Sequence, residues 1–178
     1  AMIPCLEPRN QQECYDIMFE AFDLSEELKV PVMVRLVTRI AHSRTAVATR
    51  HPLPQNALKP DKQIRKWTLV PVNARVQYQH LTEKQPALSR RPKESPRNAL
   101  DLRGRHGVVA CGLAGNYLYE NIEPDHDLSV LSIGQYPLPA KKIRTLIGHL
   151  EDLVTLQISY SFIDRALQGA LGFDDGVT

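Results

Sequence analysis

Two arginines and a histidine follow an apolar run near the start of the chain. Residues 32–44 read Val-Met-Val-Arg-Leu-Val-Thr-Arg-Ile-Ala-His-Ser-Arg, which is rich in strand-forming types. Alternation along such a strand predicts Arg35 and Arg39 on one face, with Arg35 paired to an acid on a covering helix. Arg39 and His42 then stand at the carboxyl end, where open parallel sheets bind ligands. These side chains either line a ligand site or cap the edge of the sheet.

A second pair of residues suited to binding is Gly112 and Gly115. They follow a buried strand and open a helix, so their backbone N–H groups are available to an anion. The spacing is not that of a dinucleotide fingerprint, and no Walker Lys-Ser/Thr follows. A tight turn with close packing is the simpler interpretation, and a coenzyme- or nucleotide-binding turn is the alternative.

The remaining histidines and the cysteines predict neither a catalytic group nor a metal site. No histidine pairs with another, or with a cysteine, at metal-ligand spacing. Three cysteines without a C-x-x-C pair are expected to be buried, reduced thiols, which favours a cytoplasmic protein. They are Cys5, Cys14 and Cys111.

Composition bounds the class of protein. The chain has 178 residues, of which 43% are hydrophobic and 24% charged, as in ordinary globular proteins. A net charge of +2 does not favour nucleic acid or an anionic membrane as a partner. No apolar run approaches the roughly 20 residues of a membrane span.

Residues 1–43 are expected to form a strand, a helix and a second strand. Met2–Leu6 is a short apolar run, and Asn10 with Glu13 forms a capping box for a helix that Pro31 stops. This order is one βαβ crossover, which implies a parallel sheet.

Residues 44–104 have the composition of a connection that lies over the surface. Seven prolines fall here, mixed with charged and amide residues. One helix is expected from Pro71 through Glu83. The basic residues around Arg90 to Arg105 have no interleaved aromatic residues, so a solvated segment is preferred over a nucleic-acid site.

Residues 105–178 alternate between strands and helices. Strands are expected at 108–111, 128–133 and 153–156. Helices are expected from the turn at 112–115 through about 122, at 139–150 and at 160–171. This β-α-β-α-β-α order predicts a small doubly wound α/β domain.

Several stretches together resemble a known enzyme family. They are Pro4–Pro8 with Asn10–Glu13, Pro31–Arg39 with Ala41–Ser43, Pro71–Arg75, Gly107–Gly112 with Asn116–Tyr117, and Gln135–Pro139. In this order they resemble the alpha subunit of the indolepyruvate:ferredoxin oxidoreductases, which are thiamine-diphosphate-dependent 2-oxoacid:ferredoxin oxidoreductases. The resemblance implies that residues 1–43 end a pyrimidine-binding domain and that residues 105–178 resemble the carboxyl-terminal domain of transketolase.

The resemblance also implies a function shared with parts absent from this sequence. The parent enzyme would oxidatively decarboxylate arylpyruvates to acyl-coenzyme A, using thiamine diphosphate, magnesium and iron–sulfur clusters, with ferredoxin as electron acceptor. No Gly-Asp-Gly motif or cluster-binding cysteine set is present here. We therefore expect an internal piece of a larger subunit that binds no cofactor alone, is inactive alone, and partners with other domains and a beta subunit.

Within that frame, Arg39 and His42 are expected near the cofactor or the substrate carboxylate. The chain departs from the family pattern at Gln157–Ser161, where an acidic pair followed by Gly-Tyr-Pro is expected. A non-catalytic assembly module and a coenzyme- or nucleotide-binding domain remain as alternatives.

Overall fold

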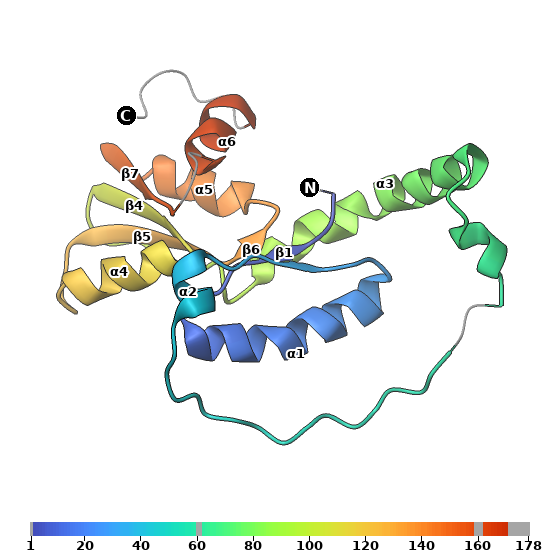
Figure 1. Cartoon of the computed structure of the whole chain (residues 1–178). Coiled ribbons are helices and arrows are strands. Elements are labelled where there is room, and N and C mark those ends of the chain that lie inside the picture. Colours follow the sequence, from blue (N-terminus) through green and yellow to red (C-terminus); the bar gives the residue numbers. More distant parts are fainter. Residues whose placement is uncertain (1, 60–61, 159–161, 171–178) are drawn as a thin grey trace.

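The computed structural model describes residues 2–59, 62–158 and 162–170 (Figure 1). In chain order the elements are β1 (Cys5–Leu6), α1 (Gln11–Leu28), β2 (Met33–Val34), α2 (Thr38–His42), the 3₁₀ helix η1 (Ile64–Trp67), α3 (Pro71–Glu94), β3 (Leu100–Asp101), β4 (His106–Cys111), α4 (Leu113–Asn121), β5 (Leu128–Ile133), β6 (Gln135–Tyr136), α5 (Ala140–Ile147), β7 (Asp152–Leu156) and α6 (Phe162–Ala170). The predicted α/β class is confirmed, with two sheets that contain parallel pairs.

Helix α1 joins β1 to the parallel strand β2, as the predicted crossover requires. Asn10 caps the helix by accepting the N–H of Glu13 at 2.9 Å. Glu13 reaches back, but to the backbone N–H of Arg9 at 2.8 Å. The buried side chains of Ile17 and Ala21 then pack against Leu6 of β1.

The expectation of one long strand from Val32 onwards is wrong. Strand β2 ends at Val34, and Thr38–His42 is the helix α2. The last backbone bond of this strand pair joins the Arg35 N–H to the Leu6 carbonyl at 2.9 Å, because β1 itself ends at Leu6. Without a partner strand the chain turns, and Ile40 packs against the second unit of the molecule. Arg35 and Arg39 therefore do not share a strand face.

The second unit is the predicted doubly wound arrangement. Strands β5, β4 and β7 are parallel and adjacent in that order, and the antiparallel β3 lies beside β5. Helix α4 covers one face of the sheet, whereas α5 and α6 cover the other (Figure 1). The larger core lies under α5 and α6 and contains Val109, Leu131, Ile143 and Leu167, each with no exposed surface.

The two units share hydrogen bonds through β6. Strand β1 pairs in parallel with β2 on one side and antiparallel with β6 on the other. The Glu7 N–H also donates to the Gly134 carbonyl at 2.8 Å. The sheet β2-β1-β6 thus joins the strands of the first unit to a strand that follows β5 of the second unit.

The connecting segment is partly extended and partly helical. Residues 44–59 have no regular structure, and Gln12 of α1 binds the backbone of Ala48 through both amide atoms. Helix α3 runs to Glu94, past the predicted end at Glu83, because Leu88 is buried against the body of the molecule. Its first half extends away from both sheets (Figure 1). None of the helices in the described ranges has the length and apolar character needed to cross a bilayer.

Candidate functional site at the crevice between the two units

A crevice lies where the two units meet at the carboxyl ends of β4 and β7. These neighbouring strands form the point where the strand order reverses, which is where open α/β sheets bind ligands. The crevice has a volume of about 400 Å³. Its lining consists of Arg35, Leu36, Val37, Thr38, Arg39, Tyr117 and Ile158. No carboxylate is among these side chains.

Arg35 links the units across this crevice. Its Nη1 lies 3.7 Å from Glu7 Oε2, and its Nη2 donates to the Ile158 carbonyl at 3.4 Å. An acidic partner was predicted for Arg35, but on a covering helix. The partner instead directly follows β1, because Arg35 stands just past the end of the adjacent strand β2.

Glu7 is the buried centre of the contacts below the crevice. Only 3% of this residue is exposed, and its Oε2 accepts a hydrogen bond from the Tyr136 hydroxyl at 2.8 Å. A Cβ on Gly112 would lie within 2.7 Å of the Glu7 side chain, and Gly112 also has φ +50°. Glycine is therefore required at position 112 by close packing and by the backbone conformation.

The packing around Gly112 and Gly115 distinguishes a structural turn from an anion-binding turn. At the amino end of α4, the Glu7 side chain lies against Gly112, with its carboxylate next to the first turn of the helix. A Cβ on Gly115 would lie 3.3 Å from the Arg9 side chain, which again indicates close packing. The geometry thus favours the structural interpretation of Gly112 and Gly115 over a phosphate-binding turn.

Two buried side chains near Glu7 are held in their neutral forms. Burial raises the pKa of the Cys111 thiol to about 12, and neighbouring Glu7 adds to this shift. Burial also raises the pKa of Tyr136, with further contributions from Cys111 and Glu7. Cys5 is buried as well, and burial raises its thiol pKa. These groups serve as packing and hydrogen-bonding groups, since a nucleophilic cysteine requires the thiolate.

Arg39 and Tyr117 form the open side of the crevice. The Arg39 guanidinium carbon lies 5.7 Å from the centre of the Tyr117 ring, within the range of a cation–π contact. In the part of the chain that the structure describes, Arg39 has no carboxylate partner. The Tyr117 hydroxyl is buried and lacks a hydrogen-bond partner among the same residues, a condition that costs about 1–3 kcal/mol.

The other candidates near the crevice are arranged differently. His42 is exposed at the end of α2 and is not among the lining residues. Gln157 turns away to α6, where its Oε1 accepts the Ile163 N–H at 3.0 Å and its Nε2 donates to Asp164 at 2.8 Å. The rest of the unusual stretch, residues 159–161, lies outside the described residues.

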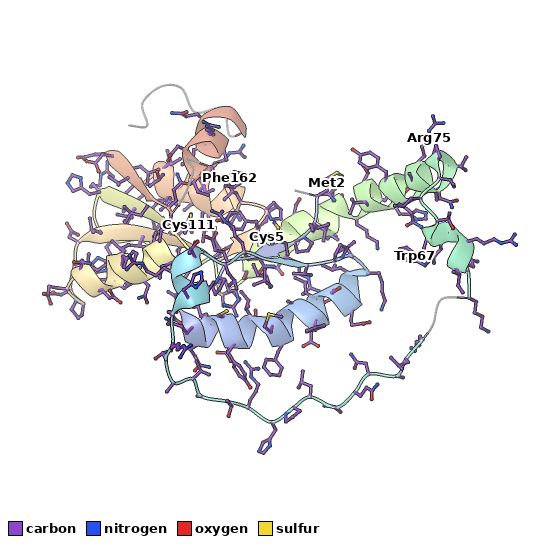
Figure 2. The ribbon with its side chains drawn as sticks, in the orientation of Figure 1. Met2, Cys5, Trp67, Arg75, Cys111 and Phe162 are labelled. Atoms are coloured by element: carbon purple, nitrogen blue, oxygen red, sulfur yellow. The ribbon has the colours of Figure 1, made fainter. Side chains whose placement is uncertain are left out.

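A second hollow lies on the face of β1 and β2 opposite α1. This apolar groove has a volume of about 550 Å³. Ile3, Cys5, Met33 and Phe162 are among its lining residues, and Cys5 and Phe162 are labelled in Figure 2. Within the described ranges, no three His, Cys, Asp or Glu side chains are grouped to hold a metal ion.

Curated relatives match almost the whole chain. The indolepyruvate oxidoreductase subunit IorA of Methanothermobacter marburgensis is 33% identical over 99% of this chain, and that of Methanothermobacter thermautotrophicus is 32% identical over 97%. The Archaeoglobus fulgidus IorA is 27% identical over 92%. The predicted resemblance is confirmed. The chain spans only 30%, 29% and 27% of the lengths of these IorA proteins, respectively.

Two further comparisons add little to the likeness to IorA. No protein-family profile matches the chain. A 2-oxoglutarate:ferredoxin oxidoreductase from Magnetococcus marinus aligns with a TM-score of 0.43 and 9% identity, over 58% of this chain and 19% of that one. A score at this level does not establish a shared fold.

Sequence reasoning placed Arg39 at the site but missed Glu7 and Tyr117. Glu7 immediately follows the carboxyl end of β1, so the rule that singled out Arg39 also applies to it. Tyr117 is one residue of an ordinary helical pattern. Its position at the crevice depends on α2, which the sequence pattern did not predict.

Proposed function

We propose that this chain is part of an indolepyruvate oxidoreductase that converts arylpyruvates to acyl-coenzyme A with ferredoxin as electron acceptor. The observation that carries this proposal is the 33% identity to IorA over 99% of the chain. The oxidoreductase would be cytoplasmic and would include a beta subunit.

In that enzyme the chain would act as scaffold and cleft wall. The described residues do not fit an iron–sulfur cluster, because no three Cys or His side chains among them are grouped as ligands. They also lack a group of acidic ligands for magnesium. Iron–sulfur clusters, magnesium and thiamine diphosphate would therefore be held by other parts of the enzyme.

Arg39 and His42 would lie on the wall of the cofactor or substrate cleft in the assembled enzyme. Support comes from their position on α2, beside the carboxyl ends of β4 and β7. Replacing each by alanine in the complete enzyme tests this placement. We expect a raised KM or lowered kcat for the 2-oxoacid, and unchanged kinetics in both variants would contradict it.

We infer that other domains of the same subunit cover the apolar groove at Met33. Parallel strands are normally buried on both faces. Helix α1 covers one face of β1 and β2, and on the other face Cys5 of β1 is buried in the core, whereas β2 is left open at Met33. Met33 is 43% exposed in this groove. A cysteine at position 33 should react rapidly with a thiol reagent in the 178-residue chain and slowly in the complete subunit. Equal rates would exclude this cover.

The activity itself is tested with the complete subunit and its beta partner. Indolepyruvate-dependent reduction of ferredoxin, with coenzyme A present, is the expected result. The 178-residue chain alone should reduce no dye with any 2-oxoacid. If the complete enzyme does not oxidise arylpyruvates, the proposed activity is wrong. If the 178-residue chain alone shows turnover, its proposed role as an inactive scaffold is wrong.

A further inference from the structure

The crevice between the units combines three features of a small-molecule site. It lies at the strand-order reversal, its volume of about 400 Å³ is within the range of ligand pockets, and two arginines line it without an acid. The order of strands β5, β4 and β7 determines where the crevice lies. The turn after β2 brings the two arginines to it.

The charge of the crevice favours an anion. Arg39 lies against the Tyr117 ring and has no carboxylate partner among the residues the structure describes. Arg35 makes a long contact of 3.7 Å with Glu7, whose Oε2 is also bound by Tyr136. The positive charge facing the crevice is thus compensated only in part.

The Tyr117 hydroxyl supplies a second, independent observation. It is buried and unpaired within the described part of the chain, although buried hydroxyl groups nearly always have a partner. Tyr117 is also a lining residue of the crevice. A ligand oxygen held there would give this hydroxyl an acceptor.

We propose that the crevice lined by Arg35, Arg39 and Tyr117 binds the carboxylate of a small organic acid. A guanidinium presents its donors in a planar fork that matches a carboxylate. Leu36, Val37 and Ile158 provide apolar walls for the rest of the molecule. A phosphate ester is less well matched, because the negative Glu7 carboxylate lies against Gly112 at the nearby helix amino end.

This inference rests on the proposed placement of Arg39 at the substrate cleft, but binding of the carboxylate can be measured without turnover by the parent enzyme. The test uses the ¹⁵N-labelled 178-residue chain, titrated with phenylacetate and with its neutral analogue phenylacetamide. We expect phenylacetate to shift the amide signals of residues 35–39, Tyr117 and Ile158. Phenylacetamide should leave them unchanged, which isolates the contribution of the carboxylate.

Three variants make the assignment specific. Arg39→Gln removes an exposed guanidinium and should weaken phenylacetate binding about tenfold, whereas Arg75→Gln makes the same change on α3, far from the crevice (Figure 2), and should have no effect. Tyr117→Phe removes only the unpaired hydroxyl and should also weaken binding. The dispersion of the amide signals checks that each variant is folded.

Several results would overturn the site. One is a phenylacetate response in Arg39→Gln equal to that of the parent chain. Another is a set of shifts spread over exposed arginines rather than confined to the crevice. Inorganic phosphate binding more tightly than phenylacetate at the same residues would refute the choice of carboxylate. If the unmodified complete enzyme does not turn over arylpyruvates while the chain still binds phenylacetate, only the proposed enzyme function is contradicted.

Discussion

The Tyr136 hydroxyl donates a hydrogen bond of 2.8 Å to Glu7 Oε2, across a separation of 129 residues. The bond joins the strand β6 to the end of β1 and lies below the crevice that Arg35 bridges. Both residues are buried, so neither side chain can readily exchange its partner for water.

Replacing Tyr136 with phenylalanine should therefore destabilise the fold. The ring is retained while a buried acceptor loses its donor, a change that costs about 1–3 kcal/mol. Urea denaturation followed by circular dichroism measures the loss. Tyr119→Phe is the matched control. Tyr119 is 44% exposed, and its hydroxyl makes a longer contact of 3.3 Å with the Ser132 hydroxyl. Equal stabilities of the two variants would show that the Glu7 bond contributes little.

Asn98 should tolerate even an isosteric change poorly. Its fully buried amide donates to the carbonyls of Pro92 and Gln135 and accepts the N–H groups of Gly134 and Gln135, at 2.8–3.0 Å. Asn98→Asp removes both donors and places a carboxyl group against two carbonyl oxygens. We expect a loss of roughly 2–5 kcal/mol in the free energy of unfolding.

The control for Asn98 is the same substitution at an asparagine that is only half-buried. Asn116 makes one exposed side-chain bond, to Glu120. Asn116→Asp should cost less than about 1 kcal/mol. If the two aspartate variants have similar midpoints in urea, the bonds of Asn98 are not formed as described.

The stability of the chain should fall at alkaline pH because of Cys111. Its pKa is about 12 in the folded state, whereas an unfolded cysteine ionises near pH 8.5, so the unfolded chain binds fewer protons between these values. The contribution is complete below about pH 8.5 and falls by about 1.4 kcal/mol per pH unit up to about pH 12. Cys111→Ala should reduce this slope. Val109→Ala, at an equally buried site in β4, should lower stability without changing the slope.

His106 should titrate at a raised pH because of its partner. Its Nδ1 lies 2.8 Å from Asp152 Oδ2, and this hydrogen bond raises the pKa of the imidazole. The resulting stabilisation is present below about pH 6.5 and is lost as the pH rises through the raised pKa. Asp152→Asn should shift the His106 titration, followed by NMR, to lower pH. Asp125→Asn, at an exposed site that makes no hydrogen bond to His106, should shift it far less. An unchanged titration in Asp152→Asn would exclude the pairing.

The doubly wound unit could be predicted because its sequence signals agree with its packing. Val108–Cys111 and Leu128–Ile133 are apolar runs of strand length, and each becomes a central buried strand. The start of α1 was likewise predicted correctly from the capping residue Asn10, because the cap depends only on local hydrogen bonds. Such features are decided within a few residues of the chain.

The region after β2 could not be predicted because its structure is decided at a distance. The apolar run from Val32 onwards fits a strand, but β1 is only two residues long, so β2 has nothing more to pair with. Helix α2 forms instead, and Ile40 is buried against Leu113. Arg39 lines the crevice from α2 rather than from the predicted strand, and its placement near a cofactor or substrate stays a prediction. Tyr117 and Glu7 acquire their roles only once the two units are packed together.

The pairing of β1 with both β2 and β6 limits how the molecule can move. Because β1 holds main-chain hydrogen bonds to both neighbours, the two units cannot hinge apart without breaking the sheet. They should melt as one cooperative transition, with the amides of β1 and β6 among the slowest to exchange with solvent. Widening of the crevice should then come from local displacement of its lining residues, Arg35 to Arg39, Tyr117 and Ile158.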